Sequence, residues 1–182
     1  MKKITAILLA VLMLTTCLVG CGKGKDETKT PQPLVDLNGE LSAIVGAVYE
    51  NYPDFPADLS LAALPVELSD ADSVKYFTGL SDGSKLKDAY VSEPMTGSQP
   101  YSVVLVRLND AADAQAVAEG MRDGIDQRKW LCVEADVLRV VACGDLVMLV
   151  MIGSNLEGLS VDTMIETFGK VCDQKFSVDL KK

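Results

Sequence analysis

The chain has 182 residues, 48% of them hydrophobic, and its 17 lysines and arginines stand against 26 acidic residues. The net charge of −9 argues against a nucleic-acid-binding protein, because no basic surface is present to displace the counterions around phosphates. The chain contains no histidine, which removes the commonest general base, the commonest metal ligand and every Ser-His-Asp or Cys-His arrangement. We therefore expect no cofactor and no enzyme of these classes.

The first 20 residues have the pattern of an export signal. Lys2 and Lys3 precede an uncharged apolar run, 4–19, which is shorter than the roughly 20 residues of a membrane span but suits a signal-peptide core. The run ends in LVGC, which resembles the lipobox of bacterial lipoproteins. In that family the cysteine, here Cys21, carries a diacylglyceryl group and becomes the mature N-terminus, so the resemblance implies fatty acyl chains such as palmitate. The alternative is a soluble secreted protein with a coincidental cysteine.

Residues 21–33 are polar and contain glycine, lysine and proline, so they cannot bury apolar surface and we expect a flexible tether. Removal of Lys2 and Lys3 with the signal leaves 15 basic against 26 acidic residues, a balance of −11. Such a domain is not expected to lie flat on an anionic bilayer. The sequence thus predicts a signal over 1–20, a lipidated cysteine and tether over 21–33, and one domain over 34–182 on the extracytoplasmic face of the cell membrane.

Amphipathic helices are predicted at both ends of this domain and between its strands. The first has apolar residues at helical spacing and stops before Pro53: Leu37, Leu41, Ile44, Val45 and Val48. A short helix over about 70–78 follows, with Gly79 as its stop. A third helix opens at Asn109-Asp110, and a last one is capped by Ser160.

Two β-hairpins separate these helices. Residues 89–93 and 101–108 form the first, and 137–143 and 146–152 flank Gly144-Asp145 in the second. Because 146–152 is apolar on both faces, it belongs in the centre of the sheet. The expected class is α+β, in the order α-α-ββ-α-ββ-α: a mainly antiparallel four-stranded sheet from two hairpins, packed with three longer helices.

The stretches YFTGL, IDQRKWLCVEAD and CGDLVMLVM, with SEPMTGSQPYS between them, resemble an uncharacterised family of small lipoproteins from Gram-positive bacteria, a domain of unknown function. The resemblance covers about 35–175. It implies a lipoprotein of the Gram-positive cell envelope and brings no catalytic residue with it.

Two stretches are candidates for ligand binding. Lys129 and Trp130 lie between a helix and a strand, where the ring beside cations suits a stacking or cation–π platform. The competing interpretation is that Trp130 fills the seam between helix and sheet. Gln99 and Tyr101 lie at a polar loop between strands and could line a groove, unless the loop is an ordinary hairpin connection.

The mature cysteines other than Cys21 lie in apolar patterns: Cys132, Cys143 and Cys172. We expect three buried thiols, with a disulfide between two of them left open.

The sequence therefore favours a membrane-anchored, non-enzymatic domain that binds an envelope protein or another envelope component. Two alternatives remain open at this point: a small-molecule receptor associated with a membrane transporter, and an envelope hydrolase that uses paired carboxylates or a Ser-Lys arrangement.

Overall fold

The computed structural model describes residues 34–182, which form one compact unit. The predicted signal, the lipid-bearing Cys21 and the tether over 21–33 lie outside the described residues. In chain order the helices and strands of the described part are α1 (Leu41–Asn51), β1 (Leu61–Pro65), α2 (Ala71–Thr78), β2 (Leu86–Pro94), β3 (Tyr101–Leu108), a 3-10 turn (Ala111–Asp113), α3 (Ala114–Gly124), β4 (Val137–Cys143), β5 (Leu146–Ile152), α4 (Val161–Cys172) and β6 (Val178–Lys181).

The strands form one antiparallel sheet in the order β1-β2-β3-β5-β4-β6. The α+β class is confirmed, but the sheet has six strands where the sequence predicted four. The additional strands are the two edges. β1 reads LAALP, which lacks β-branched residues and alternation, and β6 has only four residues at the end of the chain. Both acquire their conformation by pairing with a stronger neighbour.

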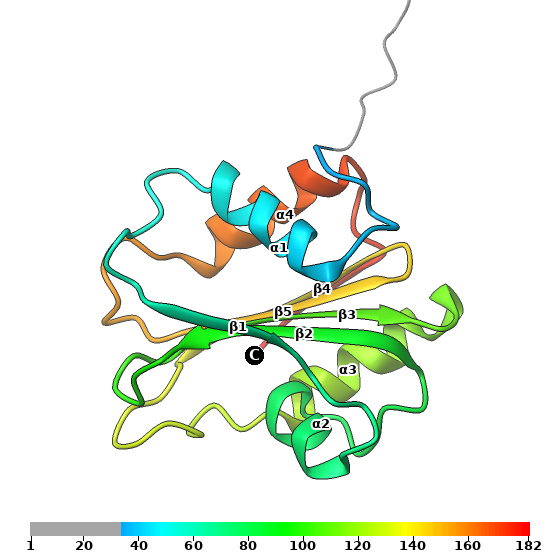
Figure 1. Ribbon diagram of the computed structural model, residues 1–182, viewed down its shortest axis with the longest axis horizontal. Coiled ribbons are helices and arrows are strands. Elements are labelled where there is room, and N and C mark those ends of the chain that lie inside the picture. Colours follow the sequence, from blue (N-terminus) through cyan, green and yellow to red (C-terminus); the bar gives the residue numbers. More distant parts are fainter. Residues whose placement is uncertain (1–33) are drawn as a thin grey trace, which may run out of the picture. The chain divides into compact units, whose positions relative to one another are not determined.

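Helices cover both faces of the sheet, as Figure 1 shows: α1 and α4 lie on one side, and α2 and α3 on the other. Each side has its own apolar cluster, which we call the α1/α4 core and the α2/α3 core. β3 and β5 contribute alternate residues to both cores and are buried along their whole length. The predicted central position of 146–152 is confirmed.

Local signals set the ends of several elements as expected. Gly144 has a positive φ of +62°, whereas Asp145 does not have a positive φ. The β4–β5 turn therefore needs glycine only at its first position. Ser160 accepts a hydrogen bond from the Thr163 N–H at 3.3 Å and caps α4, while Asp70 caps α2. The first helix, however, begins at Leu41, because residues before it form a turn closed by the Gly39 N–H and the Asp36 carbonyl.

The end of α2 and the end of α3 touch through two glycines. A Cβ on Gly124 would lie 2.1 Å from the Gly79 carbonyl oxygen, and a Cβ on Gly79 would lie 2.3 Å from the Ile125 nitrogen. Gly79 also has φ +79°, a conformation that side chains rarely adopt. The backbones therefore approach at a distance that no other residue permits.

Candidate functional site

The segment between α3 and β4 lies against the β2–β3 loop at one end of the sheet. Lys129 and Trp130, the residues that the sequence singled out, lie in this segment, and Trp130 is half-buried against the α2/α3 core. The Leu131 N–H donates to the carbonyl oxygen of Gly97 in the β2–β3 loop at 3.2 Å. The fold thus joins the two stretches that were chosen separately.

The Lys129 side chain is only 1% exposed and lies inside an aromatic cage. Its Nζ is 4.9 Å from the ring centroid of Tyr76, 5.4 Å from that of Phe77 and 5.5 Å from that of Trp130. These distances fall within the range in which a ring face attracts a cation. The aromatic platform thus holds a cation of the protein itself, and not of a ligand. Trp130 packs against the α2/α3 core and also makes a cation–π contact with Lys129.

The charge of Lys129 is balanced by a carboxylate from β2. Lys129 forms an ion pair with Glu93, whose side chain is 15% exposed and also accepts a hydrogen bond from the Ser102 hydroxyl at 2.7 Å. Burial lowers the pKa of Lys129, and the neighbouring Glu93 charge acts in the opposite direction. Burial likewise raises the pKa of Tyr76, with a smaller contribution from Glu93. The cage is thus a largely desolvated cluster in which the two opposite charges balance.

An open pocket of about 460 Å³ adjoins the cage. Its lining combines one aromatic ring with charges of both signs: Asp72, Lys75, Tyr76, Gly124, Asp126, Arg128 and Lys129. Polar groups that converge beside an aromatic wall are typical of sites for small charged ligands.

The loops above the cage expose large apolar side chains. Leu131 is 80% exposed and Met95, in the β2–β3 loop, is 75% exposed. Cys132 follows with φ +63° and is also exposed, so the prediction of three buried thiols was wrong for this residue. We call residues 95–99 and 130–132 together the loop surface. Large exposed apolar side chains on two loops that are hydrogen-bonded to each other are a mark of an interaction site.

The other two predicted binding residues have structural contacts. Gln99 is half-buried, and it accepts hydrogen bonds from the Thr96 hydroxyl at 3.1 Å and from the Tyr101 N–H at 2.9 Å. Tyr101 is fully buried in the α1/α4 core, on the face of the sheet opposite to Trp130, and its hydroxyl donates to that of Tyr49 at 3.1 Å. Burial raises the pKa of Tyr101 well above its usual value. The structure therefore does not bring Tyr101 and Lys129 together in one site.

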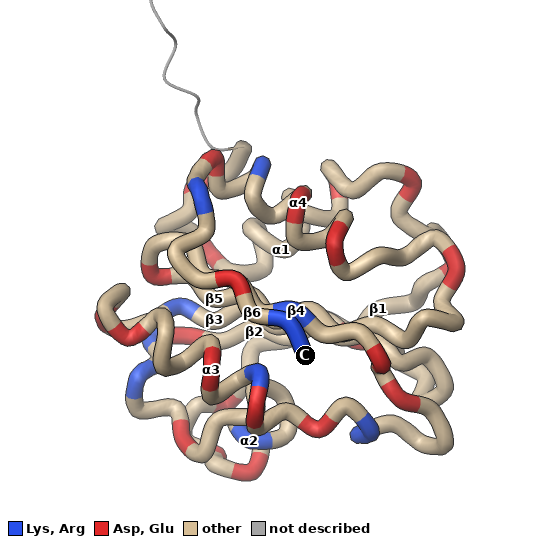
Figure 2. The backbone as a smooth tube through the Cα atoms, turned by 180° about the vertical axis from the view of Figure 1, so that it is seen from behind, with Lys and Arg blue, Asp and Glu red and all other residues tan. Residues whose placement is uncertain are grey.

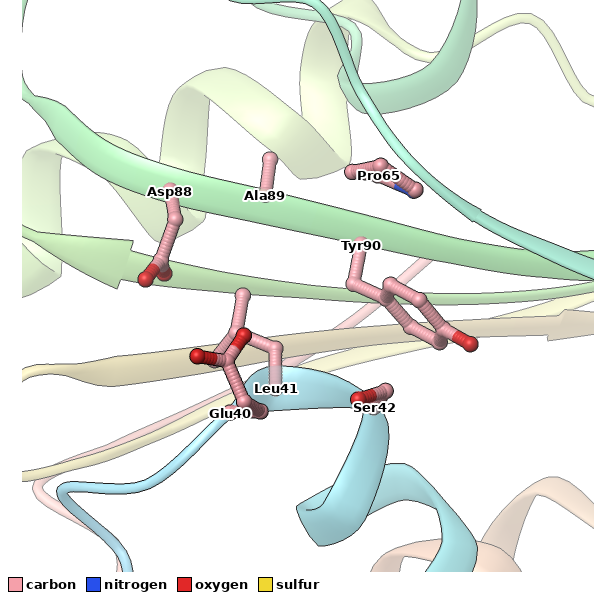
Figure 3. A pocket seen from close by; sticks show the side chains of 7 residues that line it. All are labelled: Glu40, Leu41, Ser42, Pro65, Asp88, Ala89 and Tyr90. Atoms are coloured by element: carbon pink, nitrogen blue, oxygen red, sulfur yellow. The ribbon is translucent and has the colours of Figure 1, made fainter.

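A second, smaller pocket of about 170 Å³ lies on the α1/α4 side, between the start of α1 and the strands β1 and β2 (Figure 3). Glu40 and Asp88 bring carboxylates to it, and burial and the Glu40 charge both raise the pKa of Asp88. Asp88 binds the guanidinium of Arg107 at 3.2 Å through one oxygen, while its other oxygen, although buried, has no partner among the described residues.

Arg107 is a buried charge that sequence reasoning missed, although one arginine in the strand YSVVLVRL is a visible anomaly. Its side chain is 6% exposed, and Nη2 donates to the carbonyl oxygens of Leu37 and Gly39 at 2.8 Å each. Arg107 thus fastens the segment before α1 to the central strand β3.

Within residues 34–182 no group of three or more acidic or cysteine side chains is arranged to hold a metal ion, and no helix is long and apolar enough to cross a membrane. Comparisons of the chain with protein-family models, with curated proteins and with solved structures found no match.

Proposed function

We propose that the chain is a lipoprotein anchored through acylated Cys21 to the extracytoplasmic face of the cell membrane, and that its domain is a non-enzymatic module that binds an envelope protein. The observation that supports the binding role is the loop surface, where Leu131 and Met95 expose large apolar side chains next to the buried Lys129–Glu93 pair. The anchor is supported by the signal-like residues 1–20 and the LVGC sequence.

Anchoring is tested by the fate of Cys21. Cells that produce the full chain are fed an alkyne-bearing fatty acid, and the chain is expected to incorporate it and to sediment with membranes. Cys21→Ala should lose both the label and the membrane association. A chain that sediments equally without Cys21, or that never takes up the label, would contradict the anchor without bearing on the binding role.

Binding through the loop surface is tested with a photo-crosslinking amino acid at position 131. A matched control carries the same amino acid at Glu166, which is exposed on α4. A protein partner should crosslink from position 131 and not from 166, and Met95→Asp should abolish the crosslink because it places a charge within the apolar contact. Equal crosslinking from both positions would refute the proposed surface.

The 460 Å³ pocket beside Tyr76 favours a second candidate function, reception of a small zwitterionic molecule for a membrane transporter. Its volume lies within the range of small-molecule sites. Arg128→Gln and Asp126→Asn each remove a charge from the lining of the pocket and leave both members of the buried Lys129–Glu93 pair in place. Loss of affinity for free amino acids in both variants would favour this candidate, whereas absence of any such binding in the unaltered chain would dispose of it.

A further inference from the structure

The two edges of the sheet are protected very differently. Backbone N–H and C=O groups on the outer side of an edge strand can pair with another chain, and proteins usually block them with charges or cover them. β6 forms one edge and β1 the other, as the two opposite views of Figure 1 and Figure 2 show.

The pairing register identifies the backbone groups that β1 presents outward. The Val66 N–H donates to the Ala89 carbonyl and the Met95 N–H to the Ser60 carbonyl. The backbone N–H and C=O groups of the even-numbered residues of this strand therefore point toward β2. Because this direction alternates along an antiparallel pair, the backbone groups of the odd-numbered residues point away from β2. These outward-facing residues are Leu61, Ala63 and Pro65. Within the described part of the chain, no hydrogen bond occupies their groups.

β6 has the opposite character. The Lys182 N–H donates to the Leu138 carbonyl, so the outward-facing residues of β6 are Asp179 and Lys181. Both carry charges engaged in ion pairs, Asp179 with Arg139 at 2.6 Å and Lys181 with Asp162 at 3.3 Å. An incoming strand would have to disrupt these pairs. β1 has no charged residue at all, and Ala63, Leu64 and Pro65 are exposed.

The chain segments that flank β1 in sequence carry only acidic charges. Residues 52–74 contain no lysine or arginine, and their acidic residues are all exposed: Asp54, Asp58, Glu67, Asp70 and Asp72. At the end of the strand, Pro65 lines the pocket of Figure 3 with the carboxylate of Glu40 and with Asp88, which is paired with Arg107. A bare, uncharged edge is therefore bordered by negative charge at both ends.

We infer that β1 accepts an extended segment of another protein as a seventh strand, and that this segment carries lysine or arginine at its ends. The outward N–H groups of Leu61 and Ala63, with the carbonyls of Leu61, Ala63 and Pro65, supply the main-chain bonds of such strand addition. The flanking carboxylates select a basic segment. This inference concerns a surface other than the loop surface, and it holds whether or not Cys21 is acylated.

A second copy of the chain fits the edge less well. Two copies paired antiparallel through β1 and centred on Ala63 would set Asp58 of each copy within one residue of Glu67 in the other. The like charges would then oppose association at both ends of the contact.

The test uses the full chain in mild detergent and a labelled peptide of alternating valine and threonine with two lysines at each end. We expect saturable binding by fluorescence anisotropy, and slowed hydrogen exchange of the Leu61 and Ala63 amides. Ala63→Pro removes an outward donor without breaking a bond to β2, so we expect about a tenfold loss of affinity. Ala63→Val keeps the donor and should bind as the unaltered chain does.

Three further peptides, one with the charges exchanged and two with N-methylated amides, keep the test decisive if Ala63→Pro fails to fold. Glutamates in place of the lysines should abolish binding. N-methylation of alternate amides should abolish it in one phase and spare it in the other, because only one side of the added strand faces β1. The inference is overturned if the lysine peptide does not bind, if both charge types or both methylation phases bind equally, or if Leu61 and Ala63 exchange slowly in the free chain. The last result would mean that the edge is already occupied.

Discussion

The buried ion pair predicts a large and asymmetric response to mutation. Lys129→Met keeps the length and apolar stem of the side chain inside the cage of Tyr76, Phe77 and Trp130 but removes its charge. Glu93 then remains as a carboxylate that is only 15% exposed and has lost its counter-ion. We expect the free energy of unfolding to fall by about 3–5 kcal/mol, the usual result of breaking a buried pair from one side.

The magnitude follows from the surroundings of the pair. Opposite charges about 4 Å apart attract by about 4 kcal/mol at an effective dielectric constant near 20, and each cation–π contact adds about 0.5–2 kcal/mol. The desolvation cost of both ions offsets most of this gain, so the pair as a whole contributes little. The double variant Lys129→Met/Glu93→Leu should therefore recover most of the loss and give a coupling energy of about 2–4 kcal/mol.

Urea unfolding followed by circular dichroism measures these differences as shifts in the transition midpoint at constant slope. Glu134→Gln is the matched control, because Glu134 pairs with Arg128 in solvent, with the two side chains 50% and 78% exposed. We expect that control to cost less than about 1 kcal/mol. A cost for Lys129→Met no greater than that of the control, or a double variant as unstable as the single one, would refute the reasoning.

Three further predictions concern other parts of the domain. Tyr52→Phe removes a hydroxyl that accepts from the Ser160 N–H at 2.9 Å and donates to the Gly158 carbonyl at 3.2 Å, so unfolding free energy should fall by about 1–3 kcal/mol in the same urea assay. Arg139 hydrogen-bonds Asp179 and lowers its pKa below the usual 3.8, so this stabilisation is present above pH 3.8 and lost as the pH falls below it. Arg139→Met should flatten the acid limb of a stability–pH profile, and an unchanged limb would contradict the assignment. In site-resolved alkylation of the native chain, Cys132 should react at once, while Cys143 and Cys172, at 2% and 1% exposure, should react only on unfolding.

The strong elements of this fold could be predicted because their signals are local. The valine-rich stretch 137–143, the apolar run of 146–152 and the glycine between them specify a central hairpin without knowledge of the remaining chain. Ser160 similarly marks the start of a helix by its own side chain. β1 carries no such signal, since its alanines and terminal proline disfavour a strand and only its pairing with β2 makes it one.

The candidate site could be predicted only in part, for the same reason. Lys129 and Trp130 were recognisable as a cation beside a ring. Glu93, which neutralises the cation, belongs to β2, and β3 and α3 separate it from Lys129 along the chain. Cys132 lies between Leu131 and Val133 and reads as a core thiol, yet no further strand is added at that point and the segment stays outside the sheet. Tyr101 was correctly placed at the start of a strand, and its orientation toward Tyr49 depends on the register of β3 with its neighbours.

The contact between Gly79 and Gly124 restricts the mutational history open to this protein. A methyl group at either position would lie 2.3 Å or less from the opposing backbone. Because the clash is with backbone atoms, it remains even when the other position is still glycine. Only a change that first separates the helices, in the α2–β2 connection or in the packing beneath α3, would release them. Descendants of this sequence should therefore retain both glycines together or lose both together with a rearranged α2.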